Sequence, residues 1–252
     1  MIYILFLLFS LLIIFFAYYQ WQYFMVFTPT YYREEQLLDG CELLTATTPD
    51  GVDLEGALYE PQKPTATLLV FVGRSHDAVG LINKLSLLYP QTRVITFNYR
   101  SYGESGGSLS EKSLLSDALF LADLVQKNYG DFYLLGFSLG SNLAAYVSQQ
   151  RDSKGVFLVG AFDSLKALAK TKFKFVPPPF RYKFDTQSYM QNNNTPAYIF
   201  VSKDDEITYI QNARNLQKKS KNIIYYKEFS GLSHKELLWD KNVVTKINEV
   251  MK

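Results

Sequence analysis

A single serine, Ser138, stands between two glycines where an apolar run meets a helix-forming stretch. Residues 136–140 read Gly-Phe-Ser-Leu-Gly, and they directly follow the apolar run 132–135. The helix-like stretch 141–148 begins immediately after them. This order is typical of a sharp strand-to-helix turn that exposes a serine hydroxyl, with glycines where side chains would collide. The motif alone is common, so its surroundings decide what it means.

Strand-like and helix-like segments alternate on both sides of this turn. Residues 41–47 and 52–59 flank Pro49-Asp50-Gly51 and are predicted to form a hairpin. Further strands are predicted at 67–72, 93–97, 132–135, 155–159, 197–201 and 223–229. Helices are predicted at 81–89, 113–125 with Ser110 before it, 141–148, 164–169 and 209–218, with a closing helix over 237–247. The alternation predicts one α/β domain, a mostly parallel sheet with helices on both faces.

The first thirty residues are dominated by an apolar stretch. Between Ile2 and Tyr19 there is no charged residue, and Ser10 is the one small polar residue. This length is sufficient to cross the roughly 30 Å hydrocarbon core of a bilayer as one helix. No Lys or Arg precedes the stretch and no A-x-A-like site follows it, which favours an uncleaved anchor over a signal peptide or a buried core helix. An aromatic belt at the membrane interface is predicted from Tyr18, Tyr19, Trp21 and Tyr23.

We therefore expect a transmembrane anchor over 1–27, a linker over 28–40 and the α/β domain over 41–252. The expected localisation is the membrane, with a single N-terminal pass. The side on which the domain lies stays open, because Arg33 is followed by Glu34 and Glu35 and the flanking charge shows no bias.

A base and an acid follow the serine in the chain. A serine hydroxyl needs a neighbouring base to act as a nucleophile at neutral pH. His234 follows the last predicted strand, in a loop, whereas the other histidine, His76, precedes the serine turn. Asp204 and Asp205 both leave the strand 197–201, where a carboxylate can set the tautomer of an imidazole. The order serine, acid, histidine, each after a strand, predicts a nucleophile–acid–base triad in which either aspartate is the acid.

Composition and spacing argue against several other kinds of functional site. The chain carries 26 Lys and Arg against 24 Asp and Glu, scattered along the sequence, so nucleic acid is not an expected partner. Two histidines cannot build a multi-histidine metal site, and no metal or cofactor is expected. The single cysteine, Cys41, excludes an intramolecular disulfide. The sequence GESGG at 103–107 lacks the Lys-Ser/Thr ending of a phosphate loop and is predicted to be a tight structural loop.

The segment 170–185 differs from the rest of the domain. Basic and aromatic residues interleave around Pro177-Pro178-Pro179, without a helical or strand period, which predicts an irregular excursion. Two interpretations of this segment are open. The segment is a lid-like insertion, over 170–190, that lies on an anionic bilayer surface, or it is a solvated loop whose aromatic side chains pack on the domain.

With these residues in view, the chain resembles the α/β-hydrolase superfamily. It is most similar to the membrane-anchored group of Bem46-like hydrolases and α/β-hydrolase-domain depalmitoylases. The resemblance runs from about Thr47 to the end and rests on TPDGVDLEG, LLVFVG, FNYRSYGESGG, FLADL, YLLGFSLGS, VSKDDEIT and GLSH. The chain departs from the family's usual His-Gly at Val72-Gly73, and from its usual glycine before the acid at Val201.

The resemblance implies an α/β-hydrolase fold and a catalytic triad of Ser138, Asp204 and His234. The family pattern Gly-x-x-Asp-x-x-Val aligns Asp204 with the acid and Ile207 with the valine, and Asp205 is the alternative acid. It also implies an oxyanion hole formed by the backbone N–H groups of Arg74 and Leu139.

These features predict a membrane-anchored serine hydrolase that cleaves a carboxylic ester or thioester, in an acyl lipid or an S-acylated protein, through an acyl-enzyme. Its partners would be the bilayer and the acyl substrate, while the oligomeric state stays open. A serine peptidase of related type is one alternative, although such enzymes usually carry a gating domain for which this chain has no room. A catalytically silent, membrane-tethered interaction module is the alternative from a different class.

Overall fold

The computed structural model describes residues 2–33, 36–175 and 179–252, and a single sheet organises them. Its eight strands run in the order β1-β2-β4-β3-β5-β6-β7-β8. They are β1 (Cys41–Thr47), β2 (Asp53–Tyr59), β3 (Ala66–Phe71), β4 (Thr92–Phe97), β5 (Tyr133–Phe137), β6 (Gly155–Val159), β7 (Ala197–Ser202) and β8 (Ile223–Phe229). The pairs β1–β2 and β2–β4 are antiparallel, and all other neighbours in this sheet are parallel. The predicted hairpin and the mostly parallel sheet are confirmed.

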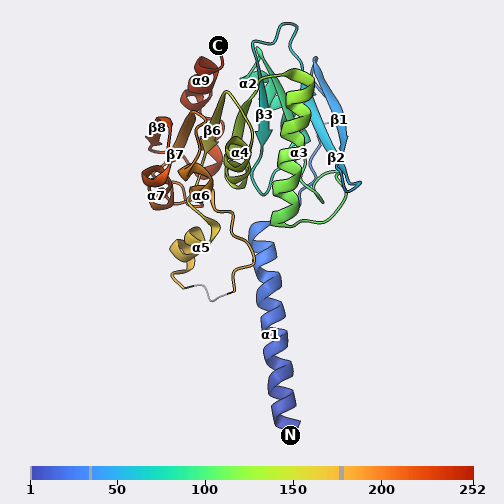
Figure 1. Cartoon of the computed structure of the whole chain (residues 1–252), viewed down its shortest axis with the longest axis vertical. Helices are drawn as coiled ribbons and strands as arrows, with labels where there is room; N and C mark the ends of the chain where they lie inside the picture. The colour runs from blue at the N-terminus through green and yellow to red at the C-terminus, as the bar shows by residue number, and fades with distance from the viewer. Residues whose placement is uncertain (1, 34–35, 176–178) are drawn as a thin grey trace.

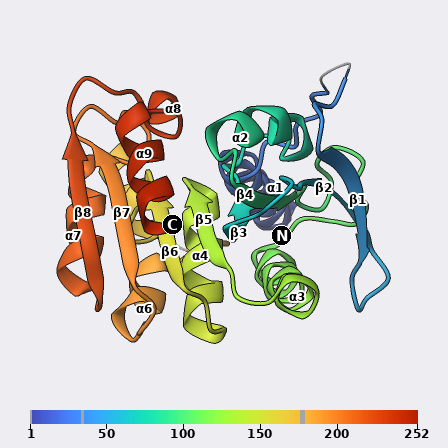
Figure 2. The ribbon, with the colours of Figure 1, turned by 90° about the horizontal axis from the view of Figure 1, so that it is seen from above.

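Helices cover both faces of the sheet, as its central strands require. The helices after the N-terminal helix α1 (Ile2–Val26) are η1 (Val79–Leu81), α2 (Ile82–Leu88), α3 (Glu111–Tyr129), α4 (Leu139–Gln150), α5 (Leu165–Phe173), α6 (Thr186–Gln191), α7 (Ile210–Lys219), α8 (His234–Leu237) and α9 (Lys241–Val250). Figure 2 shows α3, α4 and α6 on one face of the sheet and α2 and α9 on the other. All five residues of β6 are buried, which explains why this strand is a continuous apolar run in the sequence.

The N-terminal helix α1 (Ile2–Val26) extends from the domain as a stalk (Figure 1). Its most apolar 18-residue window has a mean hydropathy of 2.5 and is 0% buried in the structure. By length and composition this helix is a candidate membrane span. Its last turn is different, because Val26 and the following Phe27 are only 5% and 1% exposed and belong to the core of the domain.

Several elements differ from their predicted form. Helix α3 continues to Tyr129 and ends before Gly130, whose φ is +77°. Helix α5 continues to Phe173, into the segment predicted to be irregular, and the Phe173 ring packs on Trp21 of α1. The predicted closing helix is divided into α8 and α9. Part of the predicted lid, residues 176–178, lies outside the described residues.

Candidate active site

Ser138 occupies the sharp turn between β5 and α4 that its sequence context predicts. Its backbone has φ 53° and ψ −117°, a conformation that costs a non-glycine residue energy and is characteristic of functional sites. The flanking glycines make the turn feasible. A Cβ on Gly136 would lie 2.3 Å from the carbonyl oxygen of Gly140, and a Cβ on Gly140 would lie 2.0 Å from that of Phe71. The side chain of Ser138 is thereby held at the carboxyl edge of the sheet, and the residue is 8% exposed.

His234 contacts Asp205, and the prediction that Asp204 is its acid partner is wrong in this structure. His234 Nδ1 lies 2.7 Å from Asp205 Oδ2, and both side chains are buried. The carboxylate of Asp204 points elsewhere and accepts a hydrogen bond from the backbone N–H of Gly231, at 2.7 Å. His234 is also the first residue of the short helix α8 rather than part of a loop.

Local geometry explains why Asp205 and not its neighbour faces the imidazole. Asp205 Oδ1 accepts hydrogen bonds from the backbone N–H groups of Ile207 (2.8 Å) and Thr208 (2.7 Å). Asp205 Oδ2 accepts from the Thr208 hydroxyl at 2.6 Å, in addition to facing His234. Such turns closed by an aspartate side chain set the direction of that side chain. The spacing Asp-x-x-Thr, which Asp205 has and Asp204 lacks, is a signal in the sequence that could have separated the two aspartates.

The same contacts determine the charge of Asp205. Burial raises the pKa of this carboxyl, but the hydrogen bonds and charge of His234, with the bonds from Thr208, outweigh burial and leave the pKa below its usual value. Asp205 is therefore an anion at neutral pH. A carboxylate beside Nδ1 holds the imidazole with its proton on Nδ1, which leaves Nε2 free to accept a proton.

The imidazole of His234 lies close to the serine turn. Its ring packs on Phe137, the residue before Ser138, with 4.8 Å between ring centroids. Gly160 makes room for it, because a Cβ there would lie 3.1 Å from His234 Cε1. In the part of the chain that is described, no direct hydrogen bond joins Ser138 to His234. Such contacts are often long in substrate-free hydrolases and tighten when substrate binds.

Two backbone N–H groups lie where the resemblance implies an oxyanion hole. Leu139 is the first residue of α4, so its N–H has no partner within the helix. Arg74 follows β3, and Arg74, Ser138 and Leu139 all line one cavity. Within the described residues, neither N–H donates to another group of the protein. Both are thus free to donate to an oxygen atom bound beside Ser138.

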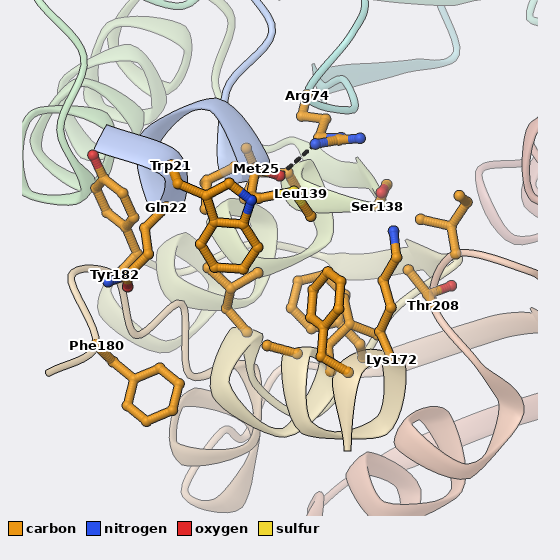
Figure 3. A pocket seen from close by; sticks show the side chains of 17 residues that line it. Trp21, Gln22, Met25, Arg74, Ser138, Leu139, Lys172, Phe180, Tyr182 and Thr208 are labelled. Atoms are coloured by element: carbon orange, nitrogen blue, oxygen red, sulfur yellow. Dashed lines mark hydrogen bonds between the residues drawn. The ribbon is translucent and has the colours of Figure 1, made fainter. Parts of the chain in front are cut away.

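The cavity beside Ser138 lies between the domain and the end of α1 (Figure 3). It encloses about 920 Å³ of empty space, a value that includes its open mouth. Its walls are mostly apolar and come from the end of α1, from α5 and from the loops around Ser138. Arg74 and Lys172 line it, whereas none of its described lining residues is Asp or Glu. In Figure 3 the Lys172 side chain points toward Ser138.

Two further features near the site had no signal in the sequence. Trp21, predicted to belong to an interfacial belt, lines the cavity together with Met25. His76 also packs on Phe137, with ring centroids 5.6 Å apart, and its Nδ1 is buried without a hydrogen-bond partner among the described residues. Burial, with a smaller contribution from His234, lowers the pKa of His76 to about 4. Among the described residues, no group of three or more His, Cys, Asp or Glu side chains is arranged to hold a metal ion.

No protein-family model matches the chain. Several curated proteins are similar to parts of it. An uncharacterised mimivirus protein, R595 of Acanthamoeba polyphaga mimivirus, is 29% identical over 185 residues, 64% of this chain and 63% of that protein. A lysophosphatidylserine lipase of Danio rerio is 27% identical over 148 residues, 49% of this chain and 38% of the lipase. An uncharacterised membrane protein of Saccharomyces cerevisiae is 32% identical over 133 residues, 50% of this chain and 47% of that protein. The matches thus span less than two thirds of each relative.

Solved structures match most of the chain. An esterase of Pyrococcus furiosus superposes with a TM-score of 0.69 and 14% identity, over 90% of this chain and 97% of the esterase. A lidless α/β serine hydrolase of Xanthomonas campestris superposes with a TM-score of 0.60 and 17% identity, over 86% of this chain and 94% of that protein. At these identities the likeness concerns the fold.

Proposed function

We propose that this chain, which has the α/β-hydrolase fold, is a membrane-anchored serine hydrolase that cleaves an ester or thioester bond of a membrane-associated acyl substrate. The observation that carries the proposal is the Asp205–His234 pair, 2.7 Å apart, beside a serine in a strained strand-to-helix turn. Each of these three residues follows a different strand of the sheet. A structural role would not need all three groups at one edge, together with two unpaired N–H groups.

The arrangement supports acyl transfer in the following order. His234 Nε2 accepts the proton of Ser138 as the hydroxyl attacks the acyl carbonyl, and Asp205 stabilises the imidazolium that forms. The N–H groups of Arg74 and Leu139 stabilise the oxyanion, each by about 3 kcal/mol. His234 then protonates the leaving group, and water releases the acyl group from Ser138 by the same steps in reverse.

The substrate class follows from the walls of the cavity and from α1. An apolar cavity beside a candidate membrane span suits an acyl chain that is presented at a bilayer. Arg74 and Lys172, without an acidic residue among the described lining residues, favour a substrate with an anionic headgroup. One relative is named a lysophosphatidylserine lipase, and lysophosphatidylserine is an ester lipid of that kind. We propose the same substrate class, an anionic acyl lipid, for the present chain.

A fluorophosphonate probe tests the proposed nucleophile directly. The full-length protein in detergent or vesicles should be labelled, whereas Ser138→Ala and His234→Ala should not. Ser141→Ala is the matched control, because this buried hydroxyl donates to the Ser138 carbonyl oxygen and does not line the cavity. Ser141→Ala should keep its labelling. Absence of labelling in the wild type, or undiminished labelling of Ser138→Ala, would rule out Ser138 as the nucleophile.

A further inference from the structure

The last turns of α1 are bound to the catalytic domain rather than merely attached to it by the chain. Gln22 is 8% exposed and uses both ends of its amide. Its Nε2 donates to the carbonyl oxygen of Pro179 (3.1 Å), and its Oε1 accepts from the backbone N–H of Arg181 (2.8 Å). The guanidinium of Arg181 lies over the Tyr19 ring, 4.0 Å from its centroid. A pure membrane anchor would not need a buried glutamine with a partner for both its Nε2 and its Oε1.

A second set of contacts joins the end of α1 to the candidate oxyanion hole. The Arg74 side chain donates a hydrogen bond to the carbonyl oxygen of Met25, one of the last carbonyls of the helix. Just beyond the end of α1, the backbone N–H of Thr28 donates to the Tyr102 hydroxyl at 3.0 Å. That hydroxyl in turn donates to the Arg74 carbonyl oxygen. The residue that offers an N–H beside Ser138 therefore also fixes the position of α1.

Between these contacts, α1 forms one wall of the cavity and α5 forms the wall opposite. The described lining residues from α1 are Trp21, Gln22, Met25 and Val26, and the apolar ones from α5 are Leu165, Leu168, Ala169 and Phe173. The Trp21 and Phe173 rings meet edge to face, with 5.5 Å between their centroids, so the two helices are in contact beside the cavity. Figure 3 shows Trp21 and Met25 on one side of the cavity and Lys172 of α5 on the other.

We propose that the space between α1 and α5 is the binding site for the single aliphatic acyl chain of the substrate. The inference rests on the proposed function and extends it, because it makes the membrane helix a part of the substrate site. The space is concave and lined mostly by apolar side chains, as the binding sites of apolar ligands are. Its α1 wall belongs to the same helix whose exposed apolar part is the candidate span. An acyl chain in the bilayer beside α1 reaches Ser138 along one continuous apolar surface, without crossing water.

The site predicts a dependence on acyl length. Each methylene that becomes buried between the two helices should raise kcat/KM about fourfold, until the cavity is full. A side chain that fills the space should therefore reduce turnover of long esters more than that of short ones. The informative quantity is the ratio of kcat/KM for p-nitrophenyl palmitate to that for p-nitrophenyl acetate.

Adjacent residues of α1 provide a matched pair of variants in the full-length protein. Met25→Trp places an indole in the cavity, whereas Phe24→Trp places it on a position that is 69% exposed and outside the cavity lining. Met25→Trp should lower the palmitate-to-acetate ratio at least tenfold, and Phe24→Trp should leave it within twofold of the wild type. Leu168→Trp, from the opposite wall, should lower it as Met25→Trp does.

The outcomes separate this inference from the proposed function. If the wild type hydrolyses acetate and is labelled at Ser138, but the two cavity variants keep the wild-type ratio, the acyl chain binds elsewhere and the inference is wrong. If Phe24→Trp lowers the ratio as much as Met25→Trp, the effect belongs to the membrane and not to the cavity. If the wild type is neither active nor labelled, the proposed function fails, and this inference with it.

Discussion

The two adjacent aspartates after β7 allow a sharp test, since the structure assigns them different tasks. In Asp205→Asn, Oδ1 can still accept from the N–H groups of Ile207 and Thr208. An amide NH₂ replaces Oδ2, which otherwise faces His234 Nδ1 at 2.7 Å. Because the amide nitrogen only donates, Nδ1 must become an acceptor, and the imidazole proton moves to Nε2. In that tautomer Nε2 cannot accept the proton of Ser138.

The expected loss is large because the wrong tautomer removes the base altogether. Loss of tautomer control in a serine triad lowers kcat by about 10⁴, which corresponds to about 5.5 kcal/mol of transition-state stabilisation. Asp204→Asn should change kcat less than about threefold, because Asp204 only accepts from the N–H of Gly231 and an asparagine oxygen can do the same. The two variants carry the same chemical change one residue apart.

The assay is kcat for a short p-nitrophenyl ester, together with the rate of fluorophosphonate labelling, at pH 7.5. Thermal unfolding of both variants checks that the difference is not one of folding. The reasoning is refuted if Asp204→Asn loses as much activity as Asp205→Asn, or if Asp205→Asn retains activity within tenfold of the wild type.

Three further predictions concern packing, protonation and charge. Gly140→Ala should lower the free energy of unfolding by about 3 kcal/mol in urea titrations, because its Cβ would lie 2.0 Å from a backbone oxygen. Gly106→Ala is the control: the atom nearest to its Cβ would be 3.7 Å away, so this variant should lose less than about 1 kcal/mol. His76 has a folded-state pKa of about 4, below its unfolded value, so the stability that it contributes is fully present above pH ~6.5 and is lost as the pH falls toward 4. The pH slope of the urea midpoint in this window should therefore be smaller in His76→Gln, and an unchanged slope would contradict the prediction. Lys172→Gln should reduce turnover of anionic lysophospholipids relative to zwitterionic ones about fivefold, and Lys170→Gln, on the same helix but outside the cavity lining, should not.

Much of the fold could be predicted because its signals are local. The buried strands appear in the sequence as apolar runs. The turn at Ser138 is marked by two glycines, at positions where the structure has no room for a Cβ atom. The ends of the helices were predicted less accurately than the strands. The continuation of α5 to Phe173 depends on its packing beside α1, and no signal in the segment itself indicates that contact.

The choice between Asp204 and Asp205 shows where pattern reasoning fails at the site. The two carboxylates are adjacent in the turn after β7 but have different partners, so an error of one residue selects the wrong one. The family pattern aligned Asp204 with the acid, while the bonds from Ile207 and Thr208 direct Asp205 toward His234. Those bonds depend on the conformation of the turn, which the alignment does not contain.

The sequence by itself determined the apolar N-terminal helix, the alternation of strands and helices, and the serine turn, because periodicity and glycine sterics act over a few neighbouring residues. Only the tertiary structure decided which groups meet across long separations. It pairs Gln22 with Arg181, the Arg74 side chain with the Met25 carbonyl, and Asp205 with His234. These contacts form because the carboxyl ends of parallel strands and the end of α1 converge on one edge of the sheet, and that convergence is a property of packing.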